Sequence, residues 1–204
     1  MKTVKKLNVA FVIDRSGSMY PMKDEVIKGF NRVLEEHGDP EVLFTVCVFS
    51  DDISFPEVRT PADKVAPLDG KSYAPDGCTA LNDAMGKTVT TLAKLTEEGE
   101  KVLFFVMTDG MENASTDYTT RDIRELVKKQ TRKGWEFVFL GANISAEEEA
   151  EKRGISRSNN FVADDKGAKL VMCAMSEGVR RMRDDEDLAD FDAELKEDYD
   201  KRGR

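Results

Sequence analysis

The chain has 204 residues, a length that suits one domain better than two. Its formal net charge of −9 argues against a nucleic-acid binder with a broad basic face, because neutralising phosphates needs clustered Lys and Arg. The charge also argues against docking on an anionic membrane, and no apolar run approaches the roughly 20 residues of a membrane span. Three widely spaced cysteines, an odd number, predict reduced thiols in a cytoplasmic protein. Cys47 and Cys173 lie in apolar patterns and are expected in the core, and burial is also expected for Cys78.

Apolar strand-like runs alternate with amphipathic helical stretches along the chain. The first strand is predicted at residues 7–14, where LNVAFVID is continuously apolar, as in a strand buried on both faces. The lysines before it resemble the start of a signal peptide, but no small-residue cleavage site follows, so we favour a strand. A helix is expected at 22–37 and strands at 42–50 and 53–59; Pro56 confines the last of these to a sheet edge.

The second half of the chain continues this alternation. A loop rich in Pro, Gly and Asp is expected at 60–78. The apolar periodicity then predicts helices at 79–95, 119–133, 146–153 and 167–182, and strands at 101–109, 135–143 and 161–163. Continuous apolar strands separated by helices are typical of a parallel sheet that is covered on both faces. The sequence therefore predicts an α/β fold.

The composition changes at the C-terminus, and we predict a domain over residues 1–183 followed by a tail over 184–204. Between residues 184 and 200 the chain has ten acidic residues and one basic residue. Four apolar residues recur there at spacings of three, four and four: Leu188, Phe191, Leu195 and Tyr199. Such spacing places them on one stripe of an otherwise anionic helix. We expect an ordered helix whose stripe is buried, either on its own domain or on a partner.

Oxygen-bearing side chains gather where the predicted strands end. After the first strand, Asp14, Ser16 and Ser18 are two residues apart, so they point to the same side of an extended segment. Asp109 ends another buried strand, and Thr79 stands just ahead of a helix. Ligands of open parallel sheets lie at the C-terminal ends of the strands, near the point where the strand order reverses. If these two strands are neighbours there, the five side chains converge.

The five side chains are two carboxylates and three hydroxyls, an oxygen-only set that suits Mg²⁺, Mn²⁺ or Ca²⁺. The single histidine, His37, excludes a His-rich zinc or iron site. Two carboxylates about 4 Å apart repel by about 4 kcal/mol at an effective dielectric constant of about 20. Either one carboxylate is protonated or a cation lies between them, and the nearby hydroxyls favour the cation. Two charges and incomplete protein ligation favour Mg²⁺ that keeps waters and leaves one position open.

The segment DRSGS at residues 14–18, Thr79 within GCTAL and Asp109 within TDG resemble the metal-ion-dependent adhesion site of the von Willebrand factor type A domain family. All five positions match in order, and the resemblance covers about residues 7–182. It implies a Rossmann-like, doubly wound, mostly parallel sheet with one antiparallel edge strand and helices on both faces. It also implies direct metal contact by the two serines, while Thr79 and Asp109 exchange direct and water-mediated contact as a ligand binds.

The chain is similar to the stand-alone cytoplasmic members of this family from bacteria, archaea and phages, because it shows neither a secretion signal nor a disulfide framework. The resemblance implies a non-enzymatic binding module that recognises a Glu or Asp carboxylate of a partner protein through Mg²⁺, with Mn²⁺ or Ca²⁺ as alternatives. By analogy with the family, the resemblance also implies that the partner belongs to a complex that contains an AAA+ ATPase. Nucleic acid and membrane are not expected, and the sequence leaves the oligomeric state open.

The alternative function is a Mg²⁺-dependent phosphohydrolase with an aspartyl nucleophile. The haloacid-dehalogenase family, however, places a second Asp two residues after its nucleophile, where this chain has Ser16. A dinucleotide-dependent enzyme is favoured less, since no Gly-x-Gly-x-x-Gly turn follows the first strand.

Other polar residues near the predicted site have plainer interpretations. Asp51, Asp52, Glu112 and Asn113 are expected to be solvated turn residues at the same edge of the sheet, with a role in ligand choice as the alternative. Thr79 is a candidate N-cap of its helix as well as a metal ligand.

Overall fold

A computed structural model of the chain describes residues 6–203. Within this part of the chain, six strands form one sheet in the order β3-β2-β1-β4-β5-β6. The strands are β1 (Leu7–Asp14), β2 (Val42–Phe49), β3 (Ile53–Pro61), β4 (Lys101–Thr108), β5 (Trp135–Gly141) and β6 (Arg157–Asn160). All neighbours pair in parallel except β2 and β3, which pair antiparallel. The predicted fold, a doubly wound, mostly parallel sheet with one antiparallel edge strand, is confirmed.

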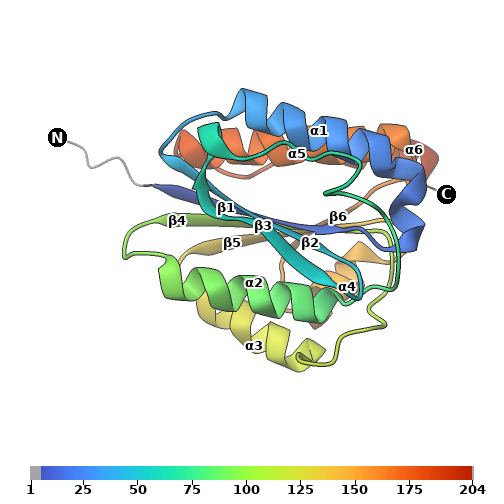
Figure 1. Ribbon diagram of the computed structural model, residues 1–204, viewed down its shortest axis with the longest axis horizontal. Coiled ribbons are helices and arrows are strands. Elements are labelled where there is room, and N and C mark those ends of the chain that lie inside the picture. The colour runs from blue at the N-terminus through green and yellow to red at the C-terminus, as the bar shows by residue number, and fades with distance from the viewer. Residues whose placement is uncertain (1–5, 204) are drawn as a thin grey trace.

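Helices cover both faces of the sheet (Figure 1). One face carries α1 (Lys23–Glu36), α5 (Asp165–Arg183) and α6 (Ala193–Arg202), and the other carries α2 (Leu81–Leu95), α3 (Thr120–Thr131) and α4 (Ala146–Lys152). Two short 3-10 turns, η1 (Gly17–Met22) and η2 (Ala62–Lys64), complete the regular structure. No helix of the described residues is both long enough and apolar enough to cross a membrane.

The central strands are buried on both faces, which explains their continuous apolar sequences. Successive residues of β1 point to opposite faces. Phe11 packs edge-on against Phe30 of α1 and Phe44 of β2, with ring centroids 5.5 and 5.0 Å apart, and Val12 joins the cluster under α2 and α3. The sheet therefore packs against a separate apolar layer of side chains on each face.

The strand order reverses at β1, which pairs with β2 on one side and with β4 on the other. The chain leaves β1 through α1 toward β2, whereas it leaves β4 through α3 toward β5. The C-terminal ends of β1 and β4 therefore lie side by side, with Ile13 opposite Met107. In Figure 1 β1 begins near the N-terminal trace at the left, so this C-terminal edge of the sheet faces right.

The last strand lies earlier than predicted. The sequence predicts a strand at 161–163, but β6 is Arg157–Asn160 and Phe161 follows it as a buried residue. The strand prediction failed because β6 is an edge strand with the half-buried polar sequence RSNN, which has no apolar run. The long loop predicted at 60–78 is also shorter, because β3 extends to Pro61 and η2 follows directly.

The three cysteines are free, but only one of them lies in the core. Cys47 is buried, as predicted, and burial raises the pKa of its thiol to about 12. Cys78 and Cys173 are exposed, so the prediction of burial is wrong for both. Cys173 lies among the apolar residues of α5, but it falls on the side of the helix that faces solvent.

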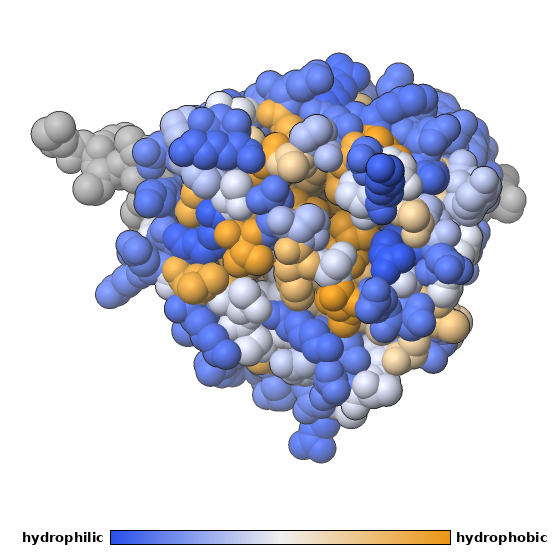
Figure 2. Space-filling model, viewed as in Figure 1, coloured by the Kyte–Doolittle hydropathy of each residue, from blue (hydrophilic) through white to orange (hydrophobic). Residues whose placement is uncertain are grey.

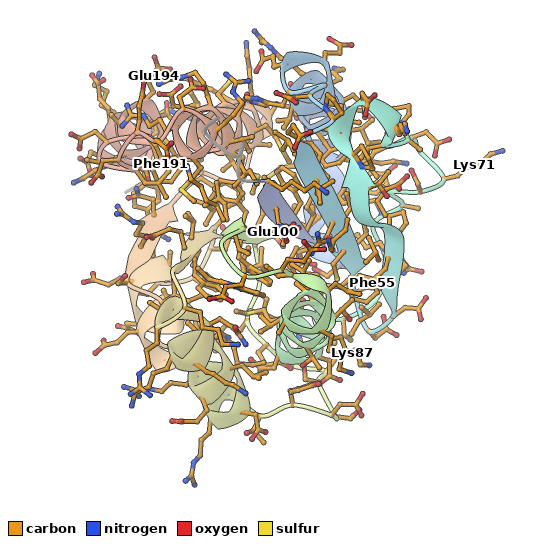
Figure 3. All side chains as sticks on the ribbon, turned by 90° about the vertical axis from the view of Figure 1, so that its left-hand side faces the viewer. Phe55, Lys71, Lys87, Glu100, Phe191 and Glu194 are labelled. Atoms are coloured by element: carbon orange, nitrogen blue, oxygen red, sulfur yellow. The ribbon has the colours of Figure 1, made fainter. Side chains whose placement is uncertain are left out.

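The acidic tail packs on the same face as α5. The helix α6 begins only at Ala193, so Leu188 and Phe191 lie in the turns before it, yet both are buried together with Leu195. The Phe191 ring lies 6.4 Å from that of Phe105 in β4 (Figure 3). The division of the chain between residues 183 and 184 stays a prediction. Residues 1–5 of the predicted domain and residue 204 of the predicted tail lie outside the described residues.

Candidate metal site

Asp14 stands at the end of β1 and is fully buried. Its Oδ1 accepts a hydrogen bond from the Ser16 backbone N–H at 2.6 Å, and its Oδ2 accepts one from the Thr108 hydroxyl at 2.6 Å. The buried Tyr73 hydroxyl donates to the Asp14 carbonyl oxygen at 2.7 Å. Burial raises the pKa of Asp14 to about 6, although the hydrogen bonds from Thr108 and Ser16 act in the opposite direction. The carboxylate is therefore fixed in place but has no charge opposite it.

Asp109 follows β4 and is also buried. Its Oδ1 accepts a hydrogen bond from the Ser18 hydroxyl at 2.6 Å, and the Ser18 and Ser16 hydroxyl oxygens are 3.1 Å apart. Burial raises the pKa of Asp109 above its usual value. The loop after β1 thus connects the two carboxylates through a line of hydrogen bonds.

Thr79 reaches the same place from the loop before α2. A Cβ added to Gly110 would lie 3.3 Å from the Thr79 hydroxyl oxygen and 3.9 Å from that of Ser18, so both hydroxyls flank the residue after Asp109. Asn113 holds Thr79 by accepting its backbone N–H at 2.8 Å and donating to its carbonyl oxygen at 3.1 Å. The structure therefore brings together all five side chains that the sequence singled out.

Thr79 is not a helix cap. The helix α2 begins at Leu81 with Ala80 as its N-cap residue, and neither Ala80 nor Thr79 makes a side-chain capping hydrogen bond in the described structure. The prediction of a capping role was therefore wrong. The position of Thr79 depends instead on Asn113, which was expected to be a solvated turn residue and is a structural contact of the site.

A second loop is pinned beside the segment after β1. The Gly17 N–H donates to the Gly77 carbonyl at 3.1 Å, and the Asp76 N–H donates to the Arg15 carbonyl at 2.8 Å. Gly77 has a φ of +77°, and a Cβ there would lie 1.9 Å from an Asp51 carboxylate oxygen. Only glycine fits this approach, which carries the chain to Thr79.

The loop after Asp109 is fastened to the start of α2 by two carboxylates. Glu112 accepts the Asn82 N–H at 2.7 Å and also binds the N–H and hydroxyl of Ser115, so the expectation that Glu112 is a solvated turn residue is wrong. Asp83 is buried and accepts the backbone N–H groups of residues 116–118 at 2.8–3.0 Å. The elements that carry Thr79 and Asp109 are thus held together as one unit.

The donor set fits a hard divalent cation. Within residues 6–203, neither Asp14 nor Asp109 takes part in an ion pair, and no group of three or more His, Cys, Asp or Glu side chains is placed to hold a metal. The set depends on two carboxylates and the hydroxyls of Ser16, Ser18 and Thr79, which are all oxygen donors. Such donors suit Mg²⁺, Mn²⁺ or Ca²⁺ and not zinc or a soft metal.

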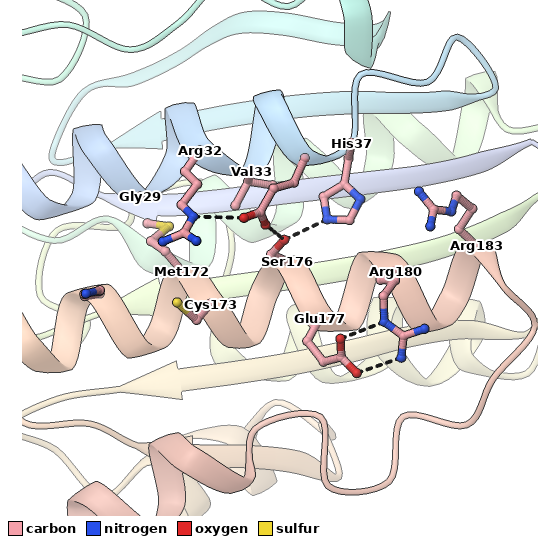
Figure 4. A pocket seen from close by; sticks show the side chains of 12 residues that line it. Gly29, Arg32, Val33, His37, Met172, Cys173, Ser176, Glu177, Arg180 and Arg183 are labelled. Atoms are coloured by element: carbon pink, nitrogen blue, oxygen red, sulfur yellow. Dashed lines mark hydrogen bonds and ion pairs between the residues drawn. The ribbon is translucent and has the colours of Figure 1, made fainter.

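Other charged side chains gather between α1 and α5, where a cavity of about 380 Å³ opens (Figure 4). Glu36 accepts hydrogen bonds from Arg32 at 2.9 Å and from the Ser176 hydroxyl at 2.5 Å. Because that hydroxyl has a single proton, which it gives to Glu36, it accepts from Nε2 of the buried His37, 2.7 Å away.

The remaining acid of this interface is Glu177, which pairs with Arg180 at 2.8 Å and with Arg181 at 2.6 Å. The hydrogen bonds from these two arginines lower the pKa of Glu177 to about 2. Both acids at the α1–α5 interface therefore have positive partners within the chain, and we assign this cavity no binding function.

Comparison with known proteins agrees with the fold. A family model described as "von Willebrand factor type A domain" matches residues 8–172. No curated protein matches the chain.

Several solved structures have a similar fold at low sequence identity. A variant of the PilB minor pilin from Streptococcus sanguinis is 11% identical with a TM-score of 0.67, covering 90% of this chain and 63% of the pilin. The conserved hypothetical protein BatB from Bacteroides thetaiotaomicron is 16% identical with a TM-score of 0.60, covering 87% of this chain and 99% of BatB. Manganese-loaded TRAP protein from Plasmodium vivax is 15% identical with a TM-score of 0.59, covering 82% of this chain and 72% of the TRAP chain. At these identities the likeness shows the fold alone, and the chain spans less than two thirds of the pilin.

Proposed function

The chain belongs to the von Willebrand factor type A domain family, and on this premise we propose that it is a divalent-metal-dependent binding module for a partner protein. Domains of this family are in general non-enzymatic interaction modules. We propose a complete metal-ion-dependent adhesion site in which Asp14, Ser16, Ser18, Thr79 and Asp109 hold Mg²⁺, with Mn²⁺ or Ca²⁺ as alternatives.

The observation that carries this proposal is the burial of Asp14 and Asp109 with no positive partner in the described chain. Burying a carboxylate without a counter-charge is costly, and burial raises the pKa of both groups. When bound, a divalent cation supplies the missing charge and an open coordination position for an outside oxygen. In this proposal the hydroxyls of Ser16, Ser18 and Thr79 act as neutral ligands, which is supported by their nearness to one another and to Asp109.

We propose that the outside ligand is a Glu or Asp carboxylate of a partner protein. A hard cation whose charge is balanced by only two carboxylates binds an anionic oxygen in preference to a neutral one. By family analogy the partner belongs to a machine built on an AAA+ ATPase, and we place the protein in the cytoplasm because its sequence shows no disulfide framework. Neither nucleic acid nor membrane is part of the proposal, given the net charge of −9.

Thermal melting in Mg²⁺ or Mn²⁺ and in EDTA tests the metal site. A ligand that binds only the native state at 100 times its Kd stabilises by about 2.7 kcal/mol, which corresponds to a rise in Tm of about 5–10 °C for a chain of this size. We expect this rise in the wild type and its loss in Asp14→Asn/Asp109→Asn.

The matched control is Asp51→Asn/Asp52→Asn, which removes two exposed acids at the same edge of the sheet and is expected to keep the full rise in Tm. An equal rise in the wild type and in Asp14→Asn/Asp109→Asn would show that the metal binds elsewhere.

A further inference from the structure

Two large apolar side chains stand exposed beside the proposed metal site. Among the described residues, the large apolar side chains with the greatest exposure are Tyr20 at 69% and Met111 at 63%, followed by Leu95 and Val58. Tyr20 comes two residues after Ser18, and Met111 comes two residues after Asp109. A single exposed apolar side chain is ordinary, so it is the position of both beside the proposed site that carries the argument.

Both side chains are held outward by fixed structure. Tyr20 lies in η1 between Met19 and Met22, which are fully buried in the core under α1. Met111 lies between Gly110, which contacts the site, and Glu112, whose carboxylate is hydrogen-bonded to the start of α2. The residues that present Tyr20 and Met111 are therefore anchored by neighbours on both sides.

The same edge of the sheet also carries exposed acids. Asp51 and Asp76 are exposed, and the Asp52 side chain is 85% exposed. Arg15 stands next to them, but it is already paired with Asp52 at 3.4 Å and with the Ala74 carbonyl at 3.3 Å. These acids repel a ligand that has several negative charges. The charge of a single carboxylate, in contrast, is compensated by the metal ion that it binds.

We propose that this surface, which we call the site rim (Tyr20, Met111, Asp51, Asp52 and Asp76), selects a partner segment with a single Glu or Asp between large apolar residues. This inference rests on the proposed metal site. The metal binds the one carboxylate, the side chains of Tyr20 and Met111 bury the apolar neighbours, and the acids of the rim disfavour acidic runs. Selectivity of this kind combines an attractive contact with a repulsive one.

The chain offers matched controls for the apolar part of the rim. Val58 lies in the edge strand β3, where Figure 2 shows apolar side chains gathered over the middle of the molecule. Leu95 ends α2, and its carbonyl binds Arg59, a residue in the second half of β3. Both are exposed and apolar like the rim residues, but they are far along the chain from any of the five site residues.

Peptide selection tests the proposal with a defined probe. A phage library of random peptides of about 12 residues is bound to the protein in Mn²⁺ and eluted with EDTA. We expect the eluted peptides to carry one acidic residue flanked by Leu, Ile, Met or an aromatic residue. A labelled copy of an eluted peptide is expected to bind about tenfold more weakly to Tyr20→Ser and to Met111→Ser. Its affinity for Val58→Ser and Leu95→Ser is expected to match that for the wild type.

Two results would overturn the rim proposal while leaving the metal site intact. One is a failed peptide test, in which the eluted peptides contain acidic runs or no acid, or in which the rim variants bind the labelled peptide as tightly as Val58→Ser and Leu95→Ser do. The other is a normal rise in Tm with Mn²⁺ but no peptide that EDTA releases. If Mn²⁺ neither raises the Tm nor retains peptides, the proposed function itself fails.

Discussion

Two regions of the molecule each hold a pair of carboxylates, but they differ in burial and in how the charges are balanced. At the α1–α5 interface, Glu36 and Glu177 have arginine partners, and the pKa of each is lowered. At the C-terminal edge of the sheet, Asp14 and Asp109 have hydroxyls and a backbone N–H in place of cations, and the pKa of each is raised by burial.

The difference indicates which region requires something from outside the chain. At the α1–α5 interface the charges of Glu36 and Glu177 are balanced by arginines of the same chain, although a cavity opens there and Nδ1 of His37 has no hydrogen-bond partner among the described residues. At the edge of the sheet, by contrast, Asp14 and Asp109 have no positive partner within the described residues. Charge balance is therefore the reason that we propose the edge of the sheet, and not the cavity, as the binding region.

The largest expected effect comes from overpacking the α1–α5 interface. A Cβ on Gly29 would lie 2.4 Å from Cγ and 2.6 Å from Cβ of Met172, so Gly29→Val forces the two helices apart. We expect a loss of about 1–3 kcal/mol in the free energy of unfolding, measured by urea denaturation. The rise in Tm with Mg²⁺ should persist, because the variant lies away from the metal site.

Gly38→Val is the matched control, since a Cβ on Gly38 would meet only the Leu34 carbonyl oxygen, at 3.6 Å. A stability change within about 0.5 kcal/mol is expected there. Loss of the Mg²⁺ response in Gly29→Val would show that the two regions are coupled, and the comparison would then fail.

The next effect concerns the residues that support the proposed metal site. Asp83→Asn weakens three charge-assisted hydrogen bonds to the loop that follows Asp109, and we expect a loss of about 1–2 kcal/mol in stability. The affinity for the metal, measured by titration calorimetry, should also fall several-fold, because the loop after Asp109 is held less firmly against the helix that follows Thr79. Asp117→Asn removes only the surface pair with Lys87 (Figure 3) and is expected to change neither quantity measurably. Unchanged metal affinity in Asp83→Asn would contradict this role.

Acid titration gives a smaller effect at the α1–α5 interface. The pKa of Glu177 is about 2 in the folded chain against its usual 4.5, so its ionised form stabilises the fold fully above about pH 4.5. That stabilisation is lost as the pH falls from about 4.5 toward 2. Glu177→Gln lacks it at every pH, so the stability difference between wild type and variant should shrink over this range. Solvent exposure limits the difference to about 1 kcal/mol.

Glu194→Gln, in an exposed acid of α6 without an ion pair in the described chain, is the control for this titration (Figure 3). A stability difference for Glu177→Gln that stays constant from pH 6 to pH 2 would show that its arginine pairs do not act as described.

No effect at all is expected in assays for turnover. Ser16 stands where an aspartyl-nucleophile phosphohydrolase needs a second acid, and its hydroxyl is instead 3.1 Å from that of Ser18. Phosphate esters and nucleotides incubated with Mg²⁺ should therefore release no phosphate above a blank. Turnover that disappears in Asp14→Asn would favour the phosphohydrolase over the binding module.

The central strands and the convergence of the five oxygen-bearing side chains at one edge of the sheet could be predicted because both are encoded locally, whereas the role of these side chains as metal ligands stays a proposal. A strand buried on both faces has an apolar run, and the site residues lie at strand ends or just ahead of a helix. The strand β6 could not be predicted, because an edge strand needs no apolar face. The contacts of Thr108, Tyr73 and Asn113 were also missed, because single polar residues in apolar or loop sequences give no local signal.

The side-chain contacts between α1 and α5 could not be predicted from the sequence for a related reason. Glu36 and Ser176 are 140 residues apart and meet only through the packing of two helices. Burial of Cys173 was predicted from its apolar neighbours, but which side of a helix faces the sheet is decided by that same packing. Local patterns therefore identify what lies at the ends of strands, whereas side-chain networks between helices depend on tertiary structure.

The most direct test of the central claim is the number of Mn²⁺ ions bound per chain, measured by electron paramagnetic resonance of free and bound Mn²⁺. We predict one ion per chain for the wild type and for Asp51→Asn/Asp52→Asn, and none for Asp14→Asn/Asp109→Asn over the same concentration range. One ion bound with equal affinity by Asp14→Asn/Asp109→Asn would contradict the claim that these two unbalanced carboxylates form the metal site.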